Sequence, residues 1–130
     1  MTVPTSTEYS TAYVIAANTA LKTLLEAEGT SGCTIKLYDS ADTLLSSSPM
    51  TDPPASVNGT TGELTLSAPG VSIATGAGRA AYGSVCDALG AYALRLPCER
   101  GTVAVPNKLV LSQLTVIVGA EITIGSATIL

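Results

Sequence analysis

The chain has 130 residues and a net charge of −4, and only 12% of its residues are charged, against about 25% in a typical soluble domain. This length fits one domain, and a content of 46% hydrophobic residues excludes a disordered chain. The six basic residues are scattered, phenylalanine and tryptophan are absent, and only the five tyrosines could stack on bases, so we expect no nucleic-acid partner.

The scarcity of charge bears on how the protein stays in solution. A bare monomer with so few charged side chains has little to resist association. We therefore expect copies of the chain, or another protein, to cover much of its surface. The alternative is a small neutral surface rich in serine and threonine.

An extended arm and one helix are predicted at the N-terminus. Residues 1–10 show no periodicity, which indicates the arm. Residues 11–28 show the spacing of an amphipathic helix, which Ser10 or Thr11 can cap at its start and Gly29 at its end. The apolar residues of the predicted helical face are Val14, Ala17, Leu21, Leu24 and Leu25.

The N-terminus also bears on where the protein folds. It lacks the basic segment of a secretory signal. No uncharged stretch of the chain reaches the roughly 20 apolar residues of a membrane-spanning helix. We therefore expect folding in a cytoplasm and no membrane partner.

Beyond residue 32 the pattern is typical of short strands separated by turns. Segment 80–98 is predicted to be a hairpin with its turn at 87–90, and 51–62 a loop rich in proline, asparagine and glycine. Roughly seven or eight strands predict a mainly β fold, an antiparallel β-sandwich or jelly-roll-like barrel with one N-terminal amphipathic helix, in a single domain over 11–130. Besides the hairpin, the segments that can hold these strands are 33–39, 42–49, 62–68, 70–76, 109–112, 114–118, 122–124 and 126–130, of which 42–49, 70–76 and 126–130 are the weaker candidates.

The stretch LTVIVGAEITI, residues 114–124, is the most apolar part of the chain. Its alternation of period two predicts a hairpin with Gly119-Ala120 as a two-residue type II′ turn. Ile117 lies on the second face, which the helix or a neighbouring subunit is expected to cover. Glu121 argues against a membrane anchor, because an unpaired carboxylate in lipid is costly. The expected core residues of this hairpin are Leu114, Val116, Val118 and Ile122 or Ile124.

No combination of residues predicts catalysis or a cofactor. The chain has no histidine, so Ser–His–Asp and Cys–His sites cannot form. Cys33, Cys86 and Cys98 lack the paired spacing of a metal site and are expected to be free thiols, although Cys86 and Cys98 can pair if their strands are neighbours. Asp39 and Asp42 could contribute to a calcium site, but turn carboxylates are the simpler interpretation. We therefore expect neither an enzyme nor a bound metal.

Three motifs, together with the preceding helix, carry a resemblance to a known family. The motifs are IKLYDS at 35–40, YGSVCDALG at 82–90 and LVLSQLTVIVGAEITIGSATI at 109–129. In this order they resemble a widespread family of small structural proteins encoded by tailed bacteriophages. The chain departs from the family pattern at Tyr82-Gly83, where an aromatic pair is expected.

The resemblance implies a virion component without enzymatic activity, made in the cytoplasm of the bacterial host, that forms a homo-oligomer and binds other virion proteins. A capsid decoration or cement protein bound to the major capsid protein is the preferred interpretation. A tail, neck or baseplate component bound to a tail protein is the alternative. The family has no catalytic motif, so no functional residue is carried over. The side chains expected at an interface are Tyr9, Tyr13, Ile117, Val118, Ile122, Ile124 and Leu130.

A different class of function is a small carbohydrate- or receptor-binding β-sandwich module. Such a module needs an exposed aromatic platform, and Tyr38, Tyr82 and Tyr92 are the candidates in the β region. Packing in the core or in an interface is expected for these tyrosines instead. An enzyme that uses paired carboxylates is the weakest alternative, because no acidic pair lies in an aromatic-rich context.

Overall fold

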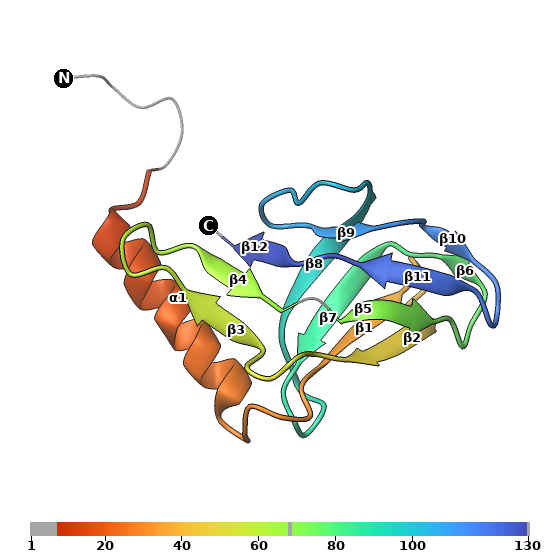
Figure 1. Ribbon diagram of the computed structural model, residues 1–130, viewed down its shortest axis with the longest axis horizontal. Coiled ribbons are helices and arrows are strands. Elements are labelled where there is room, and N and C mark those ends of the chain that lie inside the picture. The colour runs from red at the N-terminus through yellow and green to blue at the C-terminus, as the bar shows by residue number, and fades with distance from the viewer. Residues whose placement is uncertain (1–7, 68, 130) are drawn as a thin grey trace.

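The computed structural model in Figure 1 is mainly β, with one helix and a sheet that nearly closes into a barrel. This confirms the fold class expected from the sequence. The structure describes residues 8–67 and 69–129, so most of the expected arm at 1–10 lies outside the described residues. Within these ranges, helix α1 (Thr11–Glu26) precedes twelve strands. The strands are β1 (Thr34–Tyr38), β2 (Leu44–Pro49), β3 (Ala55–Val57), β4 (Leu64–Leu66), β5 (Gly70–Ile73), β6 (Gly78–Arg79), β7 (Tyr82–Cys86), β8 (Tyr92–Arg100), β9 (Leu109–Leu111), β10 (Thr115–Val116), β11 (Glu121–Ile124) and β12 (Ala127–Ile129).

Helix α1 begins and ends close to the predicted positions. Ser10 is the N-cap residue, and its Oγ atom accepts a hydrogen bond from the backbone N–H of Tyr13 at 3.2 Å. The helix ends at Glu26, two residues before the predicted end. Gly29 follows with φ +115°, a conformation that glycine adopts because it has no Cβ.

The buried face of α1 differs from the predicted apolar face. Asn18 and Leu25 are buried, whereas Ala17 and Leu24 are exposed. The Nδ2 atom of Asn18 donates to two backbone carbonyl oxygens, one in the β3–β4 turn and one in β12. Because these bonds satisfy the buried amide, a polar residue occupies the centre of the packed face.

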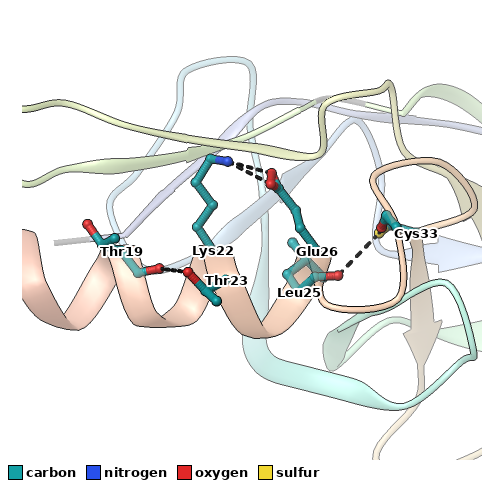
Figure 2. A network of polar contacts seen from close by, with 7 residues as sticks. Thr19, Lys22, Thr23, Leu25, Glu26 and Cys33 are labelled. Atoms are coloured by element: carbon teal, nitrogen blue, oxygen red, sulfur yellow. Dashed lines mark hydrogen bonds and ion pairs between the residues drawn. The ribbon is translucent and has the colours of Figure 1, made fainter.

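The last turns of α1 hold a small group of polar contacts, which Figure 2 shows. The Nζ atom of Lys22 lies 2.6 Å from the carboxylate of Glu26, an i,i+4 ion pair. The hydroxyl of Thr23 donates to the backbone carbonyl four residues earlier at 2.9 Å. The thiol of Cys33, just before β1, donates to the carbonyl oxygen of Leu25 at 3.6 Å. The end of the helix is thereby joined to the start of the first strand.

Seven strands form the main sheet, in the order β2-β1-β7-β8-β9-β11-β5. Its edge strands, β2 and β5, approach each other. The backbone N–H of Thr75, which follows β5, donates to the carbonyl oxygen of Leu45 in β2 at 2.8 Å. The buried hydroxyls of Ser48 and Ser72 form a hydrogen bond between the same two strands. These contacts bring the sheet close to a barrel and protect its edges.

One strand pair in this sheet is parallel, which the sequence did not predict. Residues 92–97 of β8 pair antiparallel with β7, and residues 98–100 pair parallel with β9. Residues 101–108 return the chain between these parallel segments, a shorter connection than the dozen or more residues that such pairs usually need. The short loop suffices because the parallel segments are only three residues long.

A second sheet, β12-β4-β3, lies beside the main one, and α1 packs along it (Figure 1). Apolar side chains from the helix and from both sheets form one core. Leu25 of α1, Leu64 of β4 and Leu109 of β9 are all fully buried in it. The N-terminal helix is therefore part of the folded unit.

The stretch 114–124 is not a hairpin. Strand β10 pairs with β6, whereas β11 pairs with β5 and β9. In the turn between them the backbone N–H of Ala120 donates to the carbonyl oxygen of Ile117 at 3.0 Å. Gly119 has φ +88° at the third position, which fits a type II turn rather than the predicted type II′ turn. The predicted turn is therefore displaced by one residue from the observed turn. Val118 lies at the tip of the turn, exposed to solvent, and not in the core.

Candidate interaction surfaces

The residues expected at an interface do not share one surface. Ile122 and Ile124 are 0% and 1% exposed, because the even-numbered positions of β11 face the barrel interior. The expectation is wrong for these two residues. Ile117 and Val118, in contrast, are 70% and 67% exposed at the β10–β11 turn. Leu130 lies outside the described residues.

Tyr9 and Tyr13 form a separate exposed pair at the start of α1. Their rings stack with a centroid distance of 4.8 Å. Figure 1 shows this end of the helix on the opposite side of the molecule from the β10–β11 turn. The helix packs against β3, β4 and β8, and it does not cover Ile117 as one expectation had it.

Strand β5 extends the exposed surface around Ile117. Val71 and Ile73 of this strand are 59% and 50% exposed. Strand β5 pairs with β11, and the turn 117–120 is hydrogen-bonded to the residue that follows β5. Two of the four aliphatic side chains therefore lie on β5, and two lie on the β10–β11 turn that is hydrogen-bonded to the end of this strand. We call Val71, Ile73, Ile117 and Val118 the apolar band.

Three tyrosines lie on the outer face of β1, β7 and β8, and none of them belongs to the core. Tyr38 and Tyr82 are register partners in β1 and β7, and their rings stack at 5.2 Å with an interplanar angle of 15°. Tyr92 in β8 is 56% exposed. Core packing, one of the two alternatives expected for these tyrosines, is therefore wrong, and interface packing stays a prediction. Because period-two alternation places the aliphatic neighbours of Tyr38 and Tyr82 inward, these two rings stand on the outer side of the sheet.

Arg95 of β8 joins these tyrosines. Its Cζ atom lies 4.0 Å from the ring centroid of Tyr92 and 5.5 Å from that of Tyr82, within the range of cation–π contacts. Its Nε atom donates to the hydroxyl of Ser84 at 3.2 Å. Ser84 is the register partner of both Lys36 and Arg95, so the two cationic side chains lie in one row across three strands. We call Lys36, Tyr38, Tyr82, Tyr92 and Arg95 the tyrosine–arginine face.

A carboxylate borders this face. The hydroxyl of Tyr82 donates to Oδ1 of Asp42 at 2.7 Å. This hydrogen bond raises the pKa of Tyr82, because the carboxylate favours the protonated phenol. A shallow cavity of about 350 Å³, wide open to solvent, lies beside the pair, and it combines a cation, a carboxylate and apolar surface. Its lining residues are Asp42, Ala81, Tyr82, Arg95, Leu96 and Pro97.

Asp39 and Asp87 use their carboxylates to close the two hairpin turns that follow β1 and β7. In each turn Oδ1 accepts hydrogen bonds from the backbone N–H groups two and four residues later, at 2.9 Å for Asp39 and 3.0 Å for Asp87. Asp39 is therefore a turn residue. Across residues 8–67 and 69–129, no group of three or more histidine, cysteine, aspartate or glutamate side chains is placed to hold a metal ion.

A larger cavity, of about 500 Å³, lies between the loop 101–108 and strands β9 and β11. None of its side chains titrates near neutral pH, so it offers hydroxyl and apolar contacts but no general acid or base. Its lining residues are Gly101, Thr102, Ala104, Val110, Ser112, Thr123, Gly125 and Ser126.

The three cysteines are free thiols. Cys86 and Cys98 do lie on neighbouring strands, but at opposite ends of the hairpin: Cys86 is opposite Tyr92 beside the turn, and Cys98 bonds to Ala81 at the far end. Burial raises the pKa of all three thiols, that of Cys98 to about 12. Since the thiolate is the reactive form, these residues are poor nucleophiles at neutral pH.

Known proteins offer no relative from which a function can be transferred to this chain. The chain matches no protein-family model, no curated protein and no solved structure. In the described part of the chain, no helix combines the length and hydropathy needed to cross a bilayer. Two exposed surfaces, the apolar band and the tyrosine–arginine face, are the features from which a function can be argued.

Proposed function

We propose that this chain is a non-enzymatic structural component of a tailed-phage virion, and that it assembles through the apolar band. The observation that carries the proposal is the exposure of four aliphatic side chains along β5 and the β10–β11 turn, between 50% and 70% each. Contiguous exposed apolar side chains mark interaction surfaces. The resemblance of the three sequence motifs to phage structural proteins supplies the virion context.

The size of the band bears on the kind of assembly. Burying one aliphatic side chain of this size contributes about 1.5–3 kcal/mol. Since each side chain is already shielded by about a third to a half, the whole band contributes roughly 5 kcal/mol on docking, against an association cost of about 4–15 kcal/mol. One such contact is weak, whereas a symmetric array in which each copy makes several contacts is stable.

A capsid decoration or cement protein is our preferred role within the virion. The surface of a capsid presents many identical copies of the major capsid protein, which gives a weak band the repeated contacts that it needs. A tail, neck or baseplate component is the alternative, because rings of tail proteins also repeat one contact. The two roles differ in the part of the particle that the chain binds.

Co-sedimentation of the purified chain with separated phage heads and tails tests both roles. Saturable binding to heads is the expected result, and binding to tails alone would favour the alternative. Ile73→Lys should abolish binding, because it places a charge in the band. Leu89→Lys is the matched control, since Leu89 is 76% exposed in the β7–β8 turn outside the band and its variant should bind normally. A wild-type chain that binds neither heads nor tails would refute the proposal.

A second candidate, a carbohydrate- or receptor-binding module, is favoured by one observation. Three tyrosines and an arginine gather on one exposed face beside a cavity. Aromatic rings with a few convergent polar groups are the usual composition of small-ligand sites. A virion protein can carry both surfaces, because the apolar band lies at the β5–β11 side of the barrel and the tyrosine–arginine face on β1, β7 and β8.

A further inference from the structure

We propose that the tyrosine–arginine face binds the carboxylate-bearing sugar units of an acidic glycan, in the cavity beside Tyr82 and Arg95. This inference rests on the second candidate function, saccharide binding, and adds the chemical class of the ligand. It follows from three properties of the cavity: an oriented cation, one immobilised aromatic ring and a carboxylate acceptor.

The cation is oriented but not neutralised. The guanidinium of Arg95 is fixed by its Nε bond to Ser84 and by the ring of Tyr92. In the part of the chain that the structure describes, Arg95 has no carboxylate within ion-pair distance. A guanidinium held in this way presents its outer N–H groups to an incoming carboxylate, which it binds in a bidentate geometry. The ligand is therefore expected to carry a planar anionic group.

The walls of the cavity suit a sugar ring. Tyr82 and Pro97 supply aromatic and apolar surface against which the C–H face of a pyranose can pack. Tyr82 is held from two directions, by the stacked ring of Tyr38 and by its bond to Asp42. Because the ring is already immobilised, a ligand loses less free energy to side-chain ordering on binding.

Asp42 supplies the complementary acceptor. Its Oδ1 atom accepts from Tyr82, and its second carboxylate oxygen remains available to a donor on the ligand. A sugar acid offers both groups at the spacing of one ring, hydroxyl donors for Asp42 and a carboxylate for Arg95. A nucleic-acid strand fits less well, because it needs several cations along its backbone, whereas the lining of the cavity supplies one, Arg95, which suits a single carboxylate.

A titration with a matched pair of sugars tests the inference. The ¹⁵N-labelled chain is titrated with the methyl glycoside of galacturonic acid, which carries a free carboxylate at C6. The matched neutral sugar is methyl galactoside, which carries a CH₂OH group at the same carbon. Saturable shifts of the amide signals around residues 82 and 95 are expected with the acid, with at least about tenfold weaker binding of the neutral sugar.

Two variants locate the site. Arg95→Gln should weaken binding of the acid by about tenfold or more, whereas Arg79→Gln, an exposed arginine on β6, should leave it unchanged. Equal binding of both sugars would overturn the acidic specificity while leaving saccharide binding intact. The absence of saturable shifts with either sugar would overturn the inference and the second candidate function together. The comparison between sugars uses the wild-type chain, so it stands even if one variant fails to fold.

Discussion

The side chain of Asn18 in helix α1 donates a hydrogen bond to the backbone carbonyl of Ile129 in the last strand, at 3.1 Å. The same Nδ2 atom donates to the carbonyl of Gly62 in the β3–β4 turn at 2.6 Å. One buried amide thus joins the first element, a central turn and the final strand. An otherwise apolar helix face is thereby fixed in one orientation against the second sheet.

Replacing Asn18 by alanine is expected to destabilise the protein by about 1–3 kcal/mol, because it leaves two backbone carbonyls without their donor. Thr23→Ala is the control on the same helix, since the hydroxyl of Thr23 is exposed and bonds only within the helix. The control should change the free energy of unfolding by less than about 0.5 kcal/mol. Urea denaturation followed by circular dichroism measures both, and equal effects would contradict the role given to Asn18.

The β3–β4 turn gives a second test in Gly62. Its φ is +80°, and a Cβ at this position would lie 2.8 Å from the backbone nitrogen of Ile15. Gly62→Ala is therefore expected to cost about 2–4 kcal/mol, through both strain and a clash with the helix backbone. Gly59→Ala, in the same turn with no atom within 4 Å of its Cβ, should be nearly neutral. A Gly62 variant as stable as the Gly59 variant would show that helix and turn are not packed as described.

Two buried serines of β2 should respond to alanine substitution with opposite signs. The hydroxyl of Ser48 bonds to that of Ser72 across the closure of the barrel, so Ser48→Ala should destabilise by about 1 kcal/mol. The Oγ atom of Ser46 is buried and has no partner within the described residues, so Ser46→Ala should stabilise by up to about 1 kcal/mol. Thermal unfolding of the two variants side by side measures the difference, and a lower melting temperature for Ser46→Ala would contradict it.

Stability should fall in alkaline solution because folding shields the thiol of the half-buried Cys98 from water. The pKa of Cys98 is raised from 9.0 to about 12 by burial, so between these values the folded chain keeps a proton that the unfolded chain loses. The free energy of unfolding then falls as pH rises, by up to about 1.4 kcal/mol per pH unit for this group. Cys98→Ala should give a shallower fall over the same window in denaturation series from pH 8 upward. Superimposable pH profiles would show that the thiol is not buried as described.

Much of the local structure could be predicted from the sequence, because short-range rules determine it. The Ser10 cap, the helical spacing and the turn at 87–90 each depend on residues within a few positions of one another. Strands β3 and β6 were missed, since each is two or three residues long and lies in a segment rich in glycine or proline. Their pairing depends on partners distant in the sequence, which supply the hydrogen bonds that propensity does not predict.

The errors at the C-terminal stretch have the same origin. Alternation predicted a hairpin within 114–124, but β10 and β11 pair with different strands, and the turn is displaced by one residue. That displacement exchanges the environments of neighbouring side chains, because the side-chain period of a strand is two. Val118 is exposed as a result, whereas the core position expected for Ile122 or Ile124 is confirmed, since both are buried.

The candidate surfaces were harder to predict than the elements. Ile117 was expected at an interface, but Val71 and Ile73 were not, because their place beside the β10–β11 turn follows from the β5–β11 pairing. The three tyrosines were named as a possible platform, although Arg95 and Asp42 were not assigned to it. Their proximity follows from the register of β1, β7 and β8 and from the turn after β1, neither of which a single sequence reveals.

The central claim, that this chain is a structural part of a virion, is tested most directly by imaging the particle. Electron cryo-microscopy of phage particles whose genome encodes the chain, with gold-labelled antibody against it as a second readout, locates the protein. The account predicts multiple ordered copies on the capsid surface, with β5 and the β10–β11 turn facing a neighbouring protein. Intact particles that contain no copy of the chain would contradict it.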